Sequence, residues 1–192
     1  MTASSARYFV YDFTHAAWQK NVASVVTDVD LLFANKAVLN PDESDITFEG
    51  DGQVKHVYIT KGITVEYTPD VVDLNAISSM FGKSEVTGSL PSGLARGTWM
   101  GDTTEAAGVS AGWWGRANAI KDVADVQTAV RVRIWVPLGT LTISKPPGLN
   151  TAAKAEQMVW RLSAVRTTLD VAGNALPSVP SGGAFYLLAE ES

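Results

Sequence analysis

The chain has 192 residues, 46% hydrophobic and 18% charged, and its 15 basic and 20 acidic residues give a net charge of −5. An average soluble domain carries about 25% charged residues, so the low charge suits a protein whose faces are covered by neighbours. The sequence has no Cys, which excludes disulfides, thiolate metal sites and a Cys nucleophile, and its acidic balance disfavours tight phosphate binding.

The N-terminal quarter of the chain predicts one strand followed by a long excursion. Residues 7–13 are aromatic and β-branched, which favours a strand. The residues that follow, 14–45, have weaker β character and end in the polar run 40–45. Such a run is typical of a loop, so we expect an extended excursion there.

Residues 46–68 predict a three-stranded meander with two tight turns. Gly52 ends a Gly-Asp-Gly run between two β-like segments, which favours a hairpin because both central turn positions need a positive φ. Gly62 follows Lys61 and is predicted to form the second turn. Beyond it the residues alternate between an apolar face and a polar face that carries Glu66.

A short helix is predicted over about 72–82. Its apolar residues recur at helical spacing: Leu74, Ile77 and Phe81. Gly82 then provides the usual helix stop, because glycine adopts the left-handed conformation without strain.

The second half of the chain is again β-like after a glycine-rich stretch. Residues 88–125 contain many glycines and predict the second long excursion. The segment 129–136 predicts the strongest strand, and 140–144 returns beside it. Residues 157–171 and 185–188 predict the last strands.

These elements predict one domain over residues 1–192 that is dominated by β-structure. Because its strands are joined by tight turns, we expect two packed antiparallel sheets, in a β-sandwich or a partly open barrel. One short helix flanks the sheets, and long loops leave them at about 14–45 and 88–125.

Residues that could carry chemistry do not form a catalytic or metal-binding pattern. The two histidines, His15 and His56, have no third ligand at metal spacing and lie in no nucleophile elbow. The glycines at 93, 97, 101 and 108 are not followed by the Gly-Lys-Ser/Thr of a phosphate loop. We therefore expect no catalytic residue, no metal, no cofactor and no enzymatic activity. We also expect neither a signal peptide nor a membrane span.

Two pairs of side chains are candidates for contacts. Trp113 and Trp114 are neighbours, so on a strand one could enter the core while the other meets a partner, as a subunit-interface aromatic. Packing of both under a glycine-rich loop is the alternative. Arg131 and Arg133 share a strand face and could meet an acidic or phosphate-bearing surface, or pair with cross-strand carboxylates.

Residues 46 to about 90 resemble the major tail proteins, or tail tube proteins, of long-tailed bacteriophages. The shared order is a hairpin, a Lys-Gly turn, an alternating strand, a short helix and a glycine. The resemblance implies a structural protein of the virion tail, made in the host cytoplasm, whose hexameric rings stack into a tube for genome ejection. It implies copies of itself, tape-measure, tail terminator and distal tail proteins as partners, and no membrane.

In such a tube, Glu49 and Glu66 are candidates for acids that line the lumen, because both lie on polar strand faces. Negative charge there would repel the DNA backbone, so the genome would pass without tight binding. The two long excursions could bridge stacked rings. A carbohydrate-binding or adhesion β-sandwich is the alternative function, suggested by six Trp and by the pair at 113–114.

Overall fold

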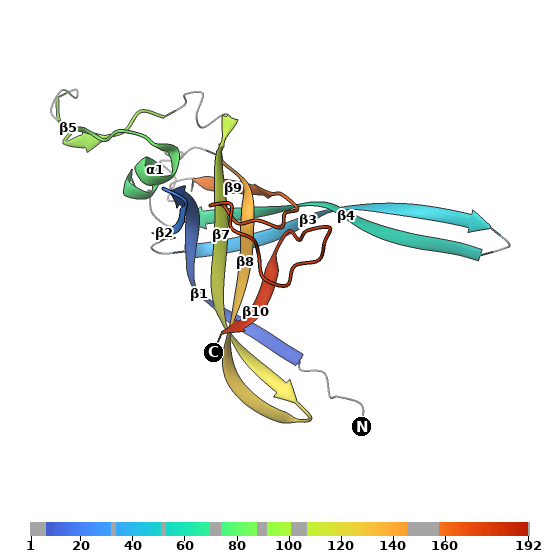
Figure 1. Ribbon diagram of the computed structural model, residues 1–192. Helices are drawn as coiled ribbons and strands as arrows, with labels where there is room; N and C mark the ends of the chain where they lie inside the picture. Colours follow the sequence, from blue (N-terminus) through green and yellow to red (C-terminus); the bar gives the residue numbers. More distant parts are fainter. Residues whose placement is uncertain are drawn as a thin grey trace, which may run out of the picture.

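The computed structural model describes residues 7–31, 34–50, 53–69, 74–87, 92–100, 107–145 and 158–191. Most of these residues lie in antiparallel strands (Figure 1), which confirms an all-β dominated fold with one short flanking helix. The helix is α1 (Leu74–Phe81), and a small ribbon is formed by β5 (Val86–Thr87) and β6 (Arg96–Gly97).

The main sheet has eight strands in the order β2-β1-β7-β8-β9-β4-β3, with β10 added beside β8. Their bounds are β1 (Arg7–Val22), β2 (Val25–Leu31), β3 (Ala34–Gly50), β4 (Gln53–Pro69), β7 (Val109–Val123), β8 (Val126–Lys145), β9 (Val159–Ala164) and β10 (Leu187–Glu191).

Strand β8 joins what the sequence suggested as two separate sheets. Its 20 residues pair with β7 along one edge, and with β10 and then β9 along the other. The predicted pair of packed sheets is therefore one continuous sheet, whose terminal strands β2 and β3 do not pair with each other.

The sheet curls around an aromatic core. Trp18 of β1 stacks on Trp160 of β9 and meets Tyr67 of β4 edge-on, with both ring-centroid distances at 5.9 Å. These strands are three and four places from β1 in the sheet order, which in a flat sheet would separate them by about 14 and 19 Å. The curl thus brings the two halves of one sheet face to face.

Helix α1 closes one side of this core. Phe81 lies against Trp160, with 5.6 Å between ring centroids. The helix ends before Gly82, whose φ of +63° is left-handed. The predicted helix and the helix-end role of Gly82 are therefore confirmed. The buried face of the helix consists of Ala76, Ile77, Met80 and Phe81.

Two hairpins turn without glycine. Residues 23–24 join β1 to β2 and residues 124–125 join β7 to β8, and all four have φ between 51° and 65°. A positive φ at both central positions defines a type I′ turn. The side-chain oxygens of Asn21 and Asp122 accept the N–H groups of residues 24 and 125, at 2.8 and 3.1 Å, and so secure these turns.

Segments that were predicted to be long excursions contain strands. Residues 14–45 include the end of β1, all of β2 and the start of β3, and residues 88–125 include all of β7. The polar run 40–45 belongs to β3. A strand can contain Pro41 because β3 is the terminal strand of the sheet, where proline is tolerated.

Gly62 lies within β4, so the turn that was predicted at Lys61-Gly62 is wrong. In the β3–β4 ladder Gly62 pairs with Asp42. The next pair joins Glu43 to Thr60, which leaves Lys61 as the extra residue of a β-bulge. Gly62 does not have a positive φ, so residues 46–68 contribute two long strands rather than a three-stranded meander.

The β3–β4 hairpin projects from the body of the molecule as an arm (Figure 1). β9 pairs with β4 only over residues 63–67, whereas the β3–β4 ladder continues to the pair Gly50–Gln53. Gly52, the predicted hairpin-turn glycine, lies outside the described residues. In the described strands, residues 53–60 of β4 pair with β3 alone.

Candidate functional site

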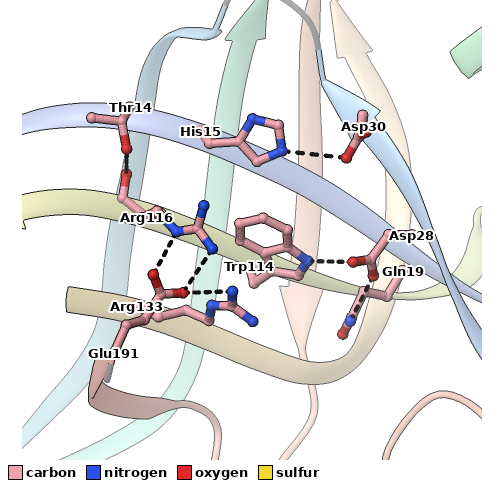
Figure 2. Close-up of polar contacts among 9 residues, drawn as sticks. All are labelled: Thr14, His15, Gln19, Asp28, Asp30, Trp114, Arg116, Arg133 and Glu191. Atoms are coloured by element: carbon pink, nitrogen blue, oxygen red, sulfur yellow. Dashed lines mark hydrogen bonds and ion pairs between the residues drawn. The ribbon is translucent and has the colours of Figure 1, made fainter. Parts of the chain in front are cut away.

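Trp113 and Trp114 lie on opposite faces of β7, as neighbours on a strand should. Trp113 enters the core and is 1% exposed. Trp114 is 6% exposed and lies among polar side chains on the other face (Figure 2). Both indoles are covered within the chain itself, so neither is the exposed interface aromatic that the sequence suggested.

Two arginines lie against the Trp114 ring. The guanidinium carbons of Arg133 and Arg116 are 4.4 and 5.5 Å from the ring centroid, within cation–π range. The two residues are directly opposite each other on β7 and β8, where like charges repel. Glu191 compensates them, because its carboxylate lies 2.6 Å from Arg116 Nε and 2.5 Å from Arg133 Nη2.

This contact confirms the prediction that Arg133 pairs with a cross-strand carboxylate, since Glu191 belongs to β10, which is paired with β8. Arg131 is exposed and lies opposite Glu191 in the ladder.

Polar partners also fix the edge of the Trp114 ring (Figure 2). Its Nε1 donates to Asp28 at 3.1 Å, and Gln19 Nε2 donates to the other oxygen of that carboxylate at 2.9 Å. Gln19 Oε1 in turn accepts the Trp135 N–H at 2.6 Å. His15 flanks the ring at 5.1 Å between centroids. Trp114 is therefore a fixed platform beneath the arginines.

Glu190, the residue before Glu191, is bound separately. Lys121 Nζ lies 2.7 Å from its carboxylate, and the Tyr8 hydroxyl donates to it, also at 2.7 Å. Because successive strand residues point to opposite faces, β10 is held from both sides of the sheet. We call these contacts the acid clamp: Glu190 with Tyr8 and Lys121, and Glu191 with Arg116 and Arg133.

The clamp shifts the pKa values of its own groups. Hydrogen bonds from Lys121 and Tyr8 hold the pKa of Glu190 below its ordinary value. Burial raises the pKa of Glu191, but the hydrogen bond from Arg116 and the charges of both arginines outweigh it and leave the pKa lowered. The hydrogen bond with Glu190 raises the pKa of Lys121 and of Tyr8. At neutral pH both glutamates are therefore ionised and Lys121 is protonated, while the Tyr8 hydroxyl stays neutral and donates its hydrogen bond.

Apart from the clamp, β10 has few anchors. Its five residues pair with β8 and, in the described part of the chain, with no other strand. Leu187 and Leu188 are 50% and 59% exposed. The connection from β9, residues 165–186, is irregular, with isolated bridges at Thr167–Ala184 and Leu169–Ala175. The strand is thus held mainly by its hydrogen bonds to β8 and by the side-chain carboxylates of Glu190 and Glu191.

The sequence pattern pointed to Arg133 but not to the other residues of the acid clamp. A usable signal was present at positions 190–191, because two successive acids on a strand face opposite ways and each needs its own basic partner. Which basic residues these are depends on the order of the strands in the sheet, which no local pattern reveals.

The first half of β1 has an open, apolar edge. β7 pairs with one side of it, while β2 begins to pair with the other side only at Ala16. None of the described strands covers residues 7–15 on that side. Four successive large hydrophobic residues here are exposed: Tyr8 40%, Phe9 53%, Val10 58% and Tyr11 63%. We call residues 7–13 the β1 edge.

The acids that were predicted to line a lumen are placed as follows. Glu66 lies on the polar face of β4, where the predicted alternation over 63–68 is confirmed. It accepts a hydrogen bond from Arg161 Nη2 of β9 at 2.6 Å, so its charge is paired. For Glu49 only the backbone is described, opposite Val54 in the β3–β4 ladder. A lumen role for either acid stays a prediction.

The described residues contain no group of three or more His, Asp or Glu that could hold a metal ion. No helix among them is long and apolar enough to cross a membrane. The sequence matches no protein-family model and no curated protein. The geometry of the chain is therefore the basis for the function proposed below.

Proposed function

We propose that this protein is a structural subunit that assembles with copies of itself, as the tail tube protein of a long-tailed bacteriophage. Hexameric rings of it would stack into a conduit for genome delivery, as a component of the virion tail made in the host cytoplasm. The observation that carries the proposal is the β1 edge.

An open strand edge presents backbone N–H and C=O groups that a further strand can pair with. Monomeric proteins usually protect such edges with charge, proline or a covering loop. Here residues 8–11 are instead large, apolar and exposed. Only Arg7 and Asp12 bring charge to the edge. This composition suits an edge that a neighbouring subunit covers.

A second open edge lies across the same part of the sheet. β10 pairs with β8 only from Arg131 onwards, so residues 126–130 of β8 face no described strand on that side. With one open edge on β1 and another on β8, each copy can pair head to tail with the next. Head-to-tail contacts close into a ring when the rotation between copies allows it.

The β3–β4 arm is our candidate for the contact between stacked rings. It projects from the body (Figure 1), and among the described strands the far part of β4 pairs with β3 alone. This assignment overlaps the segment 14–45 at residues 34–45. It replaces the rest of that segment and the segment 88–125, which were expected to bridge rings as loops but contain strands of the sheet.

The charge balance supports a conduit that does not bind its cargo tightly. The net charge of −5 repels the DNA backbone. Tape-measure, tail terminator and distal tail proteins are the further partners that a tail tube requires, and no membrane partner is proposed.

Sedimentation of edge variants tests this proposal. Phe9→Glu and Tyr11→Glu each place a charge at an exposed position of the β1 edge, so we expect loss of assembly while the monomer keeps its fold. Leu94→Glu is the matched control, because Leu94 is also exposed but lies far from β1 in the chain. Assembly of both edge variants at the parent's concentration would contradict the proposal.

A carbohydrate-binding or adhesion domain is the second candidate function. It is favoured by a cavity of about 280 Å³ beside the aromatic rings of Trp135 and Tyr186. The other lining residues are mostly apolar, with Ser178 as the main side-chain hydroxyl, so few groups could bind sugar hydroxyls. Glycan-array binding that is lost in Tyr186→Ala would favour this function, and the absence of any glycan signal would exclude it.

A further inference from the structure

The acid clamp carries an inference that rests on the proposed self-assembly. We propose that β10 is exchanged between copies: in the assembled protein, residues 187–191 of one copy pair with β8 of a second copy, and its Glu190 and Glu191 occupy that copy's clamp.

The partners of the two clamp acids all belong to the body of the molecule. Tyr8 comes from β1, Lys121 and Arg116 come from β7, and Arg133 comes from β8. None of these residues belongs to the connection 165–186 that leads into β10. A β10 strand from a second copy would therefore find the same ladder and the same charge partners.

Leaving the body costs β10 little apolar contact. Leu187 and Leu188 are half-exposed in place, so the hydrophobic effect contributes little to their position. Ion pairs on a surface are exchanged readily because water and other ions can substitute for them. The contacts of β10 are those of a strand that can be donated.

The chain can redirect β10 close to its start. The last bridge of the connection joins Ala184 to Thr167, which leaves Phe185 and Tyr186 as a short link before β10 begins. The three Cα–Cα steps from Ala184 to Leu187 span at most about 11 Å. Exchange over so short a distance requires a neighbour that is packed directly beside the clamp.

The proposed subunit contact supplies such a neighbour. Tyr8 belongs both to the β1 edge and to the acid clamp, so the surface that we assign to a second copy adjoins the site that receives β10. The open residues 126–130 of β8 continue directly from the part that β10 covers.

An acceptor without β10 is less stable than one that holds it. Without Glu191, Arg116 and Arg133 would lie side by side over Trp114 with no counter-charge, which is unfavourable. A ring in which each copy donates β10 to the next fills every acceptor, whereas an open pair leaves one vacant. Exchange therefore favours closed rings over open chains.

Cysteine cross-linking tests the exchange, because the sequence has no Cys. Ile134 and Leu188 are opposite each other on β8 and β10, and paired positions of antiparallel strands lie within disulfide range. We expect the oxidised Ile134→Cys/Leu188→Cys protein, once assembled, to give covalent multimers on a denaturing gel without reductant. Assembled particles that yield only monomers with an internal disulfide would overturn the exchange.

The matched control is Ile120→Cys/Ala129→Cys, a pair within the β7–β8 hairpin. Its disulfide must form inside one chain, so it should give monomers. If microscopy shows no assembled particles of the unsubstituted protein at any concentration, both the proposed function and the exchange fail. Assembled particles that contain only internal disulfides would overturn the exchange but not the proposed function.

A mixing experiment provides a second readout. Glu191→Arg and Arg133→Glu each place like charges together in the clamp, so each variant alone should assemble poorly. In an equimolar mixture, exchange brings the new cation at position 191 of one chain against the new anion at position 133 of the other, which reverses the loss. A mixture that assembles no better than either variant would contradict exchange, because clamps closed within each chain cannot complement each other.

Discussion

The aromatic core and the acid clamp stabilise two ends of the same sheet in different ways. Around Trp18, Trp160 and Tyr67 the stabilisation comes from buried rings, each contributing about 1.5–3 kcal/mol or more. Around β10 it comes from partly exposed ion pairs, of which those between Glu191 and the two arginines contribute about 0–1 kcal/mol each. The core therefore belongs permanently to its own chain, whereas β10 is held weakly enough to pair with a neighbouring copy.

The largest expected effect is at the core. Trp160→Ala removes a ring that stacks on Trp18 and touches Phe81, so we expect the free energy of unfolding to fall by about 3–5 kcal/mol. Chemical denaturation measures it. Trp99→Ala is the control, because Trp99 is 74% exposed and should change stability by less than about 0.5 kcal/mol. Equal losses in the two variants would contradict the assigned core.

The packing of the buried Trp113 ring needs a small residue at position 115. A Cβ at Gly115 would lie 2.5 Å from the buried Trp113 ring and 3.0 Å from Phe13. Gly115→Ala should therefore destabilise the protein by about 1–3 kcal/mol, seen as a lower denaturation midpoint. Gly182→Ala is the matched control, since a Cβ there meets nothing within 4 Å. Tolerance of Ala at 115 would show that the ring is less tightly held.

The clamp should respond to mutation and to acid. Arg133→Gln removes one cation from Glu191, and we expect amide protection over residues 187–191 to fall about 5-fold at pH 7, equivalent to about 1 kcal/mol. Residues 159–164 of β9 serve as the internal control. Unchanged protection in β10 would show that the ladder alone holds the strand.

The pH dependence of β10 has a definite sign. Glu190 and Glu191 have pKa values that are lowered from 4.5 in the folded protein. Their contribution is therefore fully present above about pH 4.5 and is lost as the pH falls through the lower, folded values. Protection factors of β10, corrected for intrinsic exchange, should drop in that acid range before those of β9 do. Simultaneous loss in both strands would argue against a separate clamp.

The smallest expected effect is a gain. Ala124 has a φ of 51° in the β7–β8 turn, a left-handed conformation that an L-residue adopts at a cost of about 1–2 kcal/mol. Ala124→Gly relieves this strain, so we expect the thermal midpoint to rise by about 2–4 °C. Ala23→Gly should act similarly in the equivalent turn. A lower midpoint in both variants would refute the assigned turn geometry.

Local patterns predicted the parts of the fold that local forces determine. The alternation over 63–68 and the helical spacing up to Phe81 each reflect one buried face, and both are confirmed. Gly82 ends the helix because its own backbone must turn left-handed. Such features need no knowledge of distant strands.

The remaining features depend on pairing between distant residues. Lys61-Gly62 has the composition of a turn, but its pairing with β3 makes it a bulge. The turns at 23–24 and 124–125 lack glycine, so composition did not reveal them. The glycines of β7 indicated a loop, whereas Gly112 and Gly115 lie in a strand where a Cβ would meet close neighbours. The clamp joins residues up to 182 positions apart.

Negative-stain microscopy of the purified full-length protein over a range of concentrations and salt tests the central claim most directly. Self-assembly through the β1 edge predicts hollow rods or hexameric rings that disappear in Phe9→Glu. A strictly monomeric species at high concentration, with neither rods nor rings under any salt condition, would contradict it.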